Sequence, residues 1–139
     1  MKRKTYIFLG LLLIAISTGS CKKYIQQQEQ NALIKLITNG SWIVTRYLDN
    51  GTDITATFSG YSFKFNSNGT VAGTNGGTVV DGTWSGDINS KTITSNFPSA
   101  TDPIAKLNAV WKITDSYTDS VAAKATIDSN INILNLHKQ

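Results

Sequence analysis

The sequence predicts an all-β domain, namely an antiparallel up-and-down barrel of eight strands preceded by a short N-terminal helix. From Trp42 onward, short segments alternate apolar and polar residues, the period of a strand with one buried face. Turns rich in Gly, Asn and Asp separate these segments at short intervals. Such spacing favours antiparallel neighbours, because parallel crossovers need a dozen or more residues. Closure into a barrel would remove the exposed edges of the sheet.

The first 21 residues fall into three parts of different composition. Residues 1–4 are charged, residues 6–16 form an apolar run too short for a comfortable membrane span, and Gly19-Ser20 come directly before Cys21. This order resembles a bacterial lipoprotein signal, with Gly19-Ser20-Cys21 matching the end of its lipobox. The resemblance implies cleavage before Cys21 and acylation of its thiol and amine, with chains such as palmitate. Thr18 departs from the pattern, since an aliphatic residue is usual there. An ordinary secretory signal with an incidental cysteine is the alternative interpretation.

Acyl chains on Cys21 would anchor the mature chain stably, because each buried CH₂ contributes about 0.8 kcal/mol. Lys22 follows the cysteine in place of the Asp associated with inner-membrane retention, which favours an outer-membrane lipoprotein of the cell envelope. The sequence does not decide the leaflet. We therefore divide the chain into a signal peptide (residues 1–20), a lipidated cysteine with a polar tether (21–31) and a barrel domain (32–139).

The formal net charge of +4 overstates how basic the mature chain is. Three of the 13 basic residues, Lys2, Arg3 and Lys4, lie in the signal, which leaves ten basic residues against nine acidic ones. No basic run with interleaved aromatic residues indicates a nucleic-acid partner. Cys21 is the only cysteine, so the sequence predicts neither an intramolecular disulfide nor a thiolate metal site.

Residues 22–30 are polar and suit either a spacer or the start of a helix. Leu33, Ile34 and Ile37 then form one helical stripe, and Asn39-Gly40 is a good helix stop. We expect a short helix over residues 32–37 that packs on one end of the barrel. A partner-binding amphipathic helix is the alternative.

The first expected strand runs from Gly40 to Leu48, with Trp42, Val44 and Leu48 on one face and Arg46 as the exception to the apolar pattern. Asp49-Asn50-Gly51 is a strong hairpin turn. Its acidic spacing has part of a calcium-loop pattern, but Gly60 stands where the closing Glu should be, so we interpret it as a turn. Residues 52–60 are less regular.

The next four expected strands are residues 61–65, 70–74, 78–85 and 91–97. Tyr61, Phe63 and Phe65 share one face of the first of these strands, and Trp84 and Phe97 lie on the apolar faces of the third and fourth. Residues 98–108 interrupt the rhythm, and Asp102-Pro103 predicts an N-cap and first turn for a short helix over 103–107.

Three strands follow, over residues 109–115, 121–127 and 131–137. The apolar parity of the last strand shifts between Ile133 and Leu134, which predicts a bulge there or a strand buried on both faces.

An N-terminal helix, a Gly-x-Trp motif opening the first strand and a meander of short strands resemble the lipocalin-like (calycin) domains, in particular those of bacterial lipoproteins. The resemblance covers residues 32–138 and implies that Trp42 packs at the closed end of the barrel, beside a basic residue for which Lys138 is an approximate match. The long first loop and the disulfide of many lipocalins are absent, which argues against a large cavity. The matching residues are Gly40, Trp42, Asp49-Asn50-Gly51, Phe63-Lys64-Phe65, Asn68-Gly69-Thr70, Gly82-Thr83-Trp84 and Leu107-Asn108-Ala109-Val110-Trp111.

Two functions follow from this architecture. The first is binding of a small hydrophobic ligand, with apolar walls for affinity and polar groups such as Arg46 or Tyr47 for orientation. The second is a structural or protein-interaction module whose barrel is filled by its own side chains and which acts through loops 49–60 and 98–108 or the helix. A cavity near 300 Å³ or more, roughly the lower range of ligand pockets, would favour the first. The candidate ligand-binding residues are Trp42, Val44, Arg46, Phe63, Phe65, Trp84 and Trp111.

No residue set in the sequence predicts an enzyme. His137 is the only histidine and lies at the terminus, and no Gly-x-Ser-x-Gly elbow or spaced acid pair occurs. We therefore predict no catalytic residue, no metal and no cofactor. The expected partners are a membrane, reached through Cys21, and a small hydrophobic ligand; no protein partner is identified.

Overall fold

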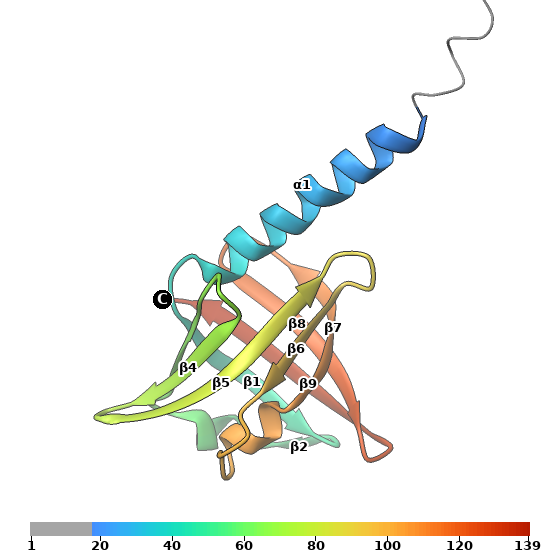
Figure 1. Ribbon diagram of the computed structural model, residues 1–139. Coiled ribbons are helices and arrows are strands. Elements are labelled where there is room, and N and C mark those ends of the chain that lie inside the picture. Colours follow the sequence, from blue (N-terminus) through green and yellow to red (C-terminus); the bar gives the residue numbers. More distant parts are fainter. Residues whose placement is uncertain (1–17) are drawn as a thin grey trace, which may run out of the picture.

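The structure is a computed structural model that describes residues 18–139 (Figure 1). Residues 1–17, which include most of the expected signal peptide, lie outside this range. The side chain of Cys21, the expected site of lipidation, also lies outside the described part of the chain. The elements in chain order are α1 (Thr18–Thr38), β1 (Trp42–Asp49), β2 (Thr52–Asp53), η1 (Thr55–Phe58), β3 (Ser62–Phe65), β4 (Thr70–Asn75), β5 (Thr78–Asp87), β6 (Thr92–Asn96), η2 (Ile104–Leu107), β7 (Ala109–Ser116), β8 (Ser120–Ile127) and β9 (Asn130–Lys138).

Eight of the strands form the predicted closed antiparallel barrel. From β3 to β9 each strand pairs with the next along the chain, and β1 closes the cylinder by pairing with both β9 and β3. The two closing ladders differ in length. Six residue pairs join β1 to β9, whereas one pair, Trp42 with Phe63, joins β1 to β3. The two-residue β2 pairs only with the end of β1.

Helix α1 is longer than the short helix expected over residues 32–37. It begins at Thr18, so residues 22–30 are the start of the helix and not a flexible spacer. The Gln and Lys residues of this segment favour a helix but add no apolar stripe. The apolar pattern of the sequence therefore predicts only those turns of the helix that pack on the barrel. Those turns cover one end of the barrel through Leu33 and Ile37, as predicted, while the rest of α1 projects away from it (Figure 1).

A bulge in β1 corrects the predicted face of this strand. The pairing with β9 shifts between Val44 and Arg46, so Thr45 is an extra residue that reverses the alternation. Tyr47 therefore points inward and is fully buried, whereas Arg46 is exposed. Trp42 keeps the predicted inward position, but Leu48 does not share its face.

The parity shift predicted in β9 is absent from that strand. Asn132 and Leu134 are both buried, and the pairing of β9 with β8 runs without interruption. The apolar pattern broke because a polar residue, Asn132, occupies an inward position. The structural irregularity lies in the partner strand β1.

The predicted short helix before β7 is present as the 3₁₀ helix η2, but its expected cap is wrong. Pro103 is the capping residue, no side chain bonds to the first turn, and the Asp102–Pro103 peptide is cis. Asp102 instead lies 3.9 Å from the amino group of Lys106.

Candidate functional site

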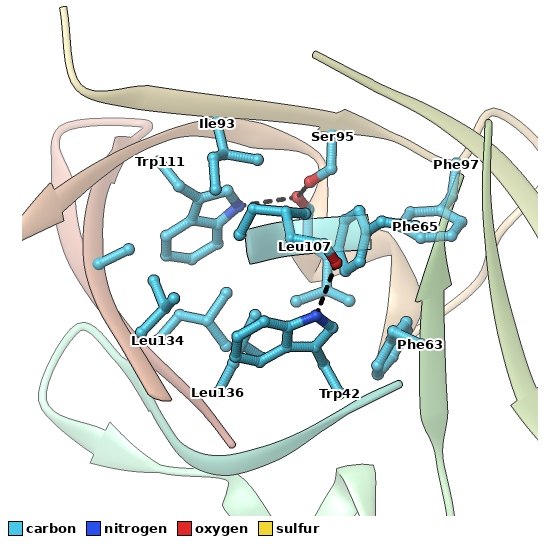
Figure 2. A pocket seen from close by; sticks show the side chains of 13 residues that line it. Trp42, Phe63, Phe65, Ile93, Ser95, Phe97, Leu107, Trp111, Leu134 and Leu136 are labelled. Carbon is cyan, nitrogen blue, oxygen red and sulfur yellow. Dashed lines mark hydrogen bonds between the residues drawn. The ribbon is translucent and has the colours of Figure 1, made fainter. Parts of the chain in front are cut away.

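The barrel interior contains an apolar cavity of about 40 Å³ (Figure 2). Trp42, Phe63, Phe65 and Trp111, four of the predicted ligand-binding residues, line it. The volume holds little more than one water molecule, whose share of liquid volume is about 30 Å³. It is far below the roughly 300 Å³ at which ligand pockets begin.

Aromatic rings fill the space that a ligand would need. The ring of Phe63 meets Phe97 edge to face, with centroids 6.3 Å apart, and Tyr47 meets Trp111 in the same way at 5.9 Å. Such contacts between large rings are typical of a packed core. An eight-stranded barrel is just wide enough for its own side chains to fill.

The polar atoms around the cavity are already hydrogen-bonded. The indole N–H of Trp111 and the hydroxyl of Ser95 both donate to the carbonyl oxygen of Leu107, at 2.9 and 2.5 Å (Figure 2). The indole N–H of Trp42 donates to the carbonyl oxygen of Ile37 at 2.8 Å. Among the residues that the structure describes, the cavity therefore presents carbon walls and no free polar group to fix a ligand.

Trp42 also has the basic neighbour that the lipocalin resemblance implied. The amino group of Lys138 lies 5.0 Å from the centre of the Trp42 ring and donates to the carbonyl oxygen of Leu36 at 3.2 Å. A cation over an indole face is a favourable contact. The end of β9, β1 and α1 are thus joined at this end of the barrel.

Three predicted ligand-binding residues do not line the cavity. Trp84 is buried, but it lies edge-on to Phe65 and donates its indole N–H to the carbonyl oxygen of Asn66 at 2.8 Å. Val44 is half-buried against the core. Arg46 is exposed, because the bulge at Thr45 turns it away from the interior.

A larger hollow, which we call the distal hollow, lies at the other end of the barrel. Its volume is about 310 Å³, and its walls come from the end of β1, the η2 segment and the turn between β8 and β9. Figure 1 shows η2 and β2 at the end away from α1. The polar residues that line the hollow are Asp49, Asp102, Lys106, Asn108, Asp128, Asn130 and Asn132.

Lys106 is the central charge of the distal hollow. Its amino group lies 2.7 Å from the carboxylate of Asp49 and 3.9 Å from that of Asp102. The hydrogen bond to Asp49 raises the pKa of Lys106 above its ordinary value. The lysine therefore stays charged at neutral pH, and the carboxylates of the lining exceed this cation in number.

A buried network fixes the floor of the hollow. The hydroxyl of Tyr47 donates to the carbonyl oxygen of Lys106 at 2.7 Å and accepts from the amide of Asn132 at 3.3 Å. The side-chain oxygen of Asn132 accepts from the backbone N–H of Asn50 at 3.0 Å. Burial raises the pKa of Tyr47, so its hydroxyl remains a neutral donor. The ring of Tyr47 stacks on Phe58 at 5.3 Å, which ties the floor to the core.

Sequence reasoning identified the two loops beside the distal hollow but not its key residues. Asp49 and Lys106 are 57 positions apart, and Tyr47 and Asn132 are 85 apart. Only closure of the barrel brings them together. The one available signal was the polar residue Asn132 inside an otherwise alternating strand.

Within residues 18–139, no three side chains among His, Cys, Asp and Glu are grouped closely enough to hold a metal ion. No helix described for these residues combines the length and the apolar content needed to cross a bilayer.

Comparisons with known proteins support the fold. No family model matches the sequence, and no curated protein matches it. Among solved structures, the chain is similar to a DUF4847 family protein from Bacteroides vulgatus, with 16% sequence identity and a TM-score of 0.58. The match covers 77% of this chain and 99% of that one. At this identity the likeness shows a shared fold.

Proposed function

We propose that this protein is a lipid-anchored module of the cell envelope that recognises a protein partner through the distal hollow and catalyses no reaction. The observation that carries the proposal is the contrast between the two hollows. The interior offers about 40 Å³ with no free polar group, whereas the distal hollow offers about 310 Å³ lined by charged and amide side chains. Cys21 supplies the anchor in this proposal, at the outer membrane.

The distal hollow suits recognition because its polar groups are held in place before a partner arrives. Lys106 is paired with Asp49, and its backbone carbonyl is bonded by Tyr47. Groups fixed in this way lose little conformational entropy on binding. The surplus of carboxylates favours a partner segment with a basic side chain, whose ammonium or guanidinium could enter the hollow.

Photocrosslinking in the native cell tests the proposed site. A photoreactive benzoylphenylalanine is placed at Asn130, on the rim of the hollow, or at Asn89 as a matched control. Both are exposed asparagines of a hairpin, Asn130 at the first position of β9 and Asn89 in the turn between β5 and β6, which packs near α1. We expect one recurrent crosslinked protein from Asn130 and none from Asn89. In the Asn130 background, Lys106→Ala should diminish that product. No product, or the same product from both positions, would refute the site.

The anchor is tested independently of the hollow. Mass spectrometry of the protein from native membranes should show acyl chains on Cys21, and Cys21→Ser should release the protein from the membrane fraction. A wild-type N-terminus without acyl chains would remove the anchor and leave the crosslinking result unaffected.

Binding of a small hydrophobic ligand remains the second candidate, and the uniformly apolar wall of the interior favours it. The cavity would have to expand from about 40 Å³ to roughly 300 Å³. Native mass spectrometry of the gently purified protein distinguishes the two functions. Extra mass that disappears on denaturation, and that is lost in Trp111→Ala, would support a carrier. A mass without such an adduct would support the filled module.

A further inference from the structure

The outer wall of the barrel next to the distal hollow has two exposed apolar side chains. Val110 in β7 and Ile131 in β9 are 57% and 59% exposed. Asn108, two residues before Val110, and Asn130, directly before Ile131, both line the hollow. The two apolar side chains therefore lie beside the hollow, where a partner seated in it would pass over them.

Two lysines lie further from the hollow on the same wall. Lys112 of β7 and Lys124 of β8 are directly opposite each other in the ladder, and both are exposed. Like charges at opposite positions of neighbouring strands destabilise a sheet. None of the ion pairs found within residues 18–139 includes either lysine, and Asp115, the nearest acidic residue along β7, forms none of them. This lysine pair therefore offers two uncompensated charges to an acidic group.

The hollow, the apolar side chains and the lysine pair follow one another in the same order on neighbouring strands. In β7 the order occupies positions 108, 110 and 112. In β8 it occupies positions 128, 126 and 124, where Thr126 is the cross-strand partner of Ile131. Alternate residues of a strand share one face and are about 6.8 Å apart. The wall thus has an acidic end, an apolar middle and a basic end at the spacing of alternate strand residues.

We infer that this wall binds an extended segment of the protein partner in which a basic, an apolar and an acidic side chain occupy alternate positions, in that order outward from the hollow. An extended segment presents alternate side chains to one side at the same spacing as the wall. This inference rests on the proposed function of the distal hollow, and it adds the chemistry and the order of the residues that the partner presents.

Charge complementarity assigns each position of the segment. The basic side chain meets the carboxylates of Asp49, Asp102 and Asp128, which outnumber the ammonium group of Lys106. The apolar side chain covers Val110 and Ile131, and the acidic side chain meets the lysine pair. A bilayer of anionic lipid or a nucleic acid is negative throughout, so the acidic end of the wall would repel it.

The experiment uses the whole protein purified in detergent and two fluorescein-labelled peptides of identical composition. In the ordered peptide, arginine, leucine and glutamate occupy alternate positions separated by serines. In the shuffled peptide, arginine and leucine exchange places. Fluorescence anisotropy measures the affinity of each peptide, and circular dichroism verifies the fold of every variant. We expect the ordered peptide to bind more tightly than the shuffled one.

Substitutions on the wall assign the contacts. Lys112→Ser with Lys124→Ser should weaken binding of the ordered peptide by about two- to fivefold for each exposed ion pair lost, whereas Lys23→Ser with Lys35→Ser, at exposed positions of α1, should leave it unchanged. Replacing the glutamate of the peptide by glutamine should weaken binding to the wild-type protein but not to the variant without the lysine pair.

The apolar contact has its own control. Val110→Ser should weaken binding of the ordered peptide, and Val79→Ser, at a 56% exposed position of β5, should not. Equal binding of the ordered and shuffled peptides, binding of neither, or ordered-peptide binding that does not depend on the lysine pair would overturn the inference.

The hollow itself is judged separately, by the crosslink from Asn130. If Lys106→Ala diminishes that product and loss of the lysine pair does not, the proposed function stands and the inferred segment is wrong. If both changes diminish it, the hollow and the wall bind the same partner. Absence of the product refutes the proposed function, whatever the peptides show.

Discussion

The indole N–H of Trp42 donates to the carbonyl oxygen of Ile37 at 2.8 Å, and this bond joins the first residue of β1 to the last turn of α1. Lys138, near the end of β9, lies over the same indole ring. One side chain thus fixes the start of the barrel, its last strand and the helix that covers its end.

Trp42→Phe should destabilise the protein by about 1–3 kcal/mol, because it leaves a buried carbonyl without its donor. The midpoint of urea unfolding, followed by far-ultraviolet circular dichroism, measures the effect. Val110→Ala, at an exposed position of β7, serves as the reference substitution. A Trp42→Phe protein as stable as this reference would show that the bond is not needed to hold α1.

Substitutions at adjacent positions test the bulge in β1. Arg46→Ala should change the free energy of unfolding by no more than about 0.5 kcal/mol, because the side chain is exposed. Tyr47→Ala should cost about 3–5 kcal/mol, because it empties a fully buried aromatic site. Chemical denaturation of both variants provides the comparison. A larger loss of stability in Arg46→Ala than in Tyr47→Ala would contradict the bulge and support the regular strand that the sequence pattern predicted.

Alkaline pH should weaken the fold through the distal network. Burial raises the pKa of Tyr47 above its unfolded value, and the bond to Asp49 raises the pKa of Lys106. In both cases the stabilisation is fully present below the unfolded pKa, about 10 for Tyr and 10.4 for Lys, and is lost as pH rises through the folded pKa. Unfolding midpoints should therefore fall above about pH 10.

The share of this alkaline effect due to Tyr47 can be isolated. Tyr47→Phe should lose the last component of the ultraviolet titration of phenolate and should show a shallower alkaline decline in stability. Tyr117→Phe, at an exposed position, is the control. If the high-pH component of the titration survives in Tyr47→Phe, that component belongs to another tyrosine and the prediction is wrong.

Gly82 is needed where β5 passes close to β6. A methyl group added there would lie 2.5 Å from the carbonyl oxygen of Asn96 and 2.7 Å from the ring of Phe97. Gly82→Ala should therefore destabilise the barrel by about 1–3 kcal/mol. Gly77→Ala is the matched control, because nothing lies within 4 Å of its added methyl. Thermal melts of the two variants give the comparison, and equal melting temperatures would contradict the close approach.

The strand patterns predicted the barrel because the inward face of each strand is mostly apolar and the turns between the strands are rich in Gly, Asn and Asp. Val121, Ala123 and Ala125 alternate in β8 as expected and are all buried. The bulge in β1 escaped this reasoning, since the residues from Trp42 to Leu48 read as a regular strand on their own. Only the register against β9 shows that Thr45 is the extra residue.

The candidate site was less predictable than the fold. The aromatic residues proposed as a ligand site do meet in the interior, but whether rings leave a cavity depends on their rotamers and mutual packing. The distal hollow depends on residues from opposite ends of the domain, such as Asp49 and Lys106. Their separate sequence contexts, a hairpin turn and a short helix, contain no sign of the pairing.

We expect the native state to open first at the seam between β1 and β3, which a single residue pair joins. Local opening costs least where few backbone hydrogen bonds and little buried surface are lost. Separation of β3 from β1 breaks one ladder pair, whereas separation of β9 from β1 breaks six. Amide hydrogens of β3 should therefore exchange with solvent before those of β9. We therefore expect entry into the aromatic interior to require opening of the seam between β1 and β3.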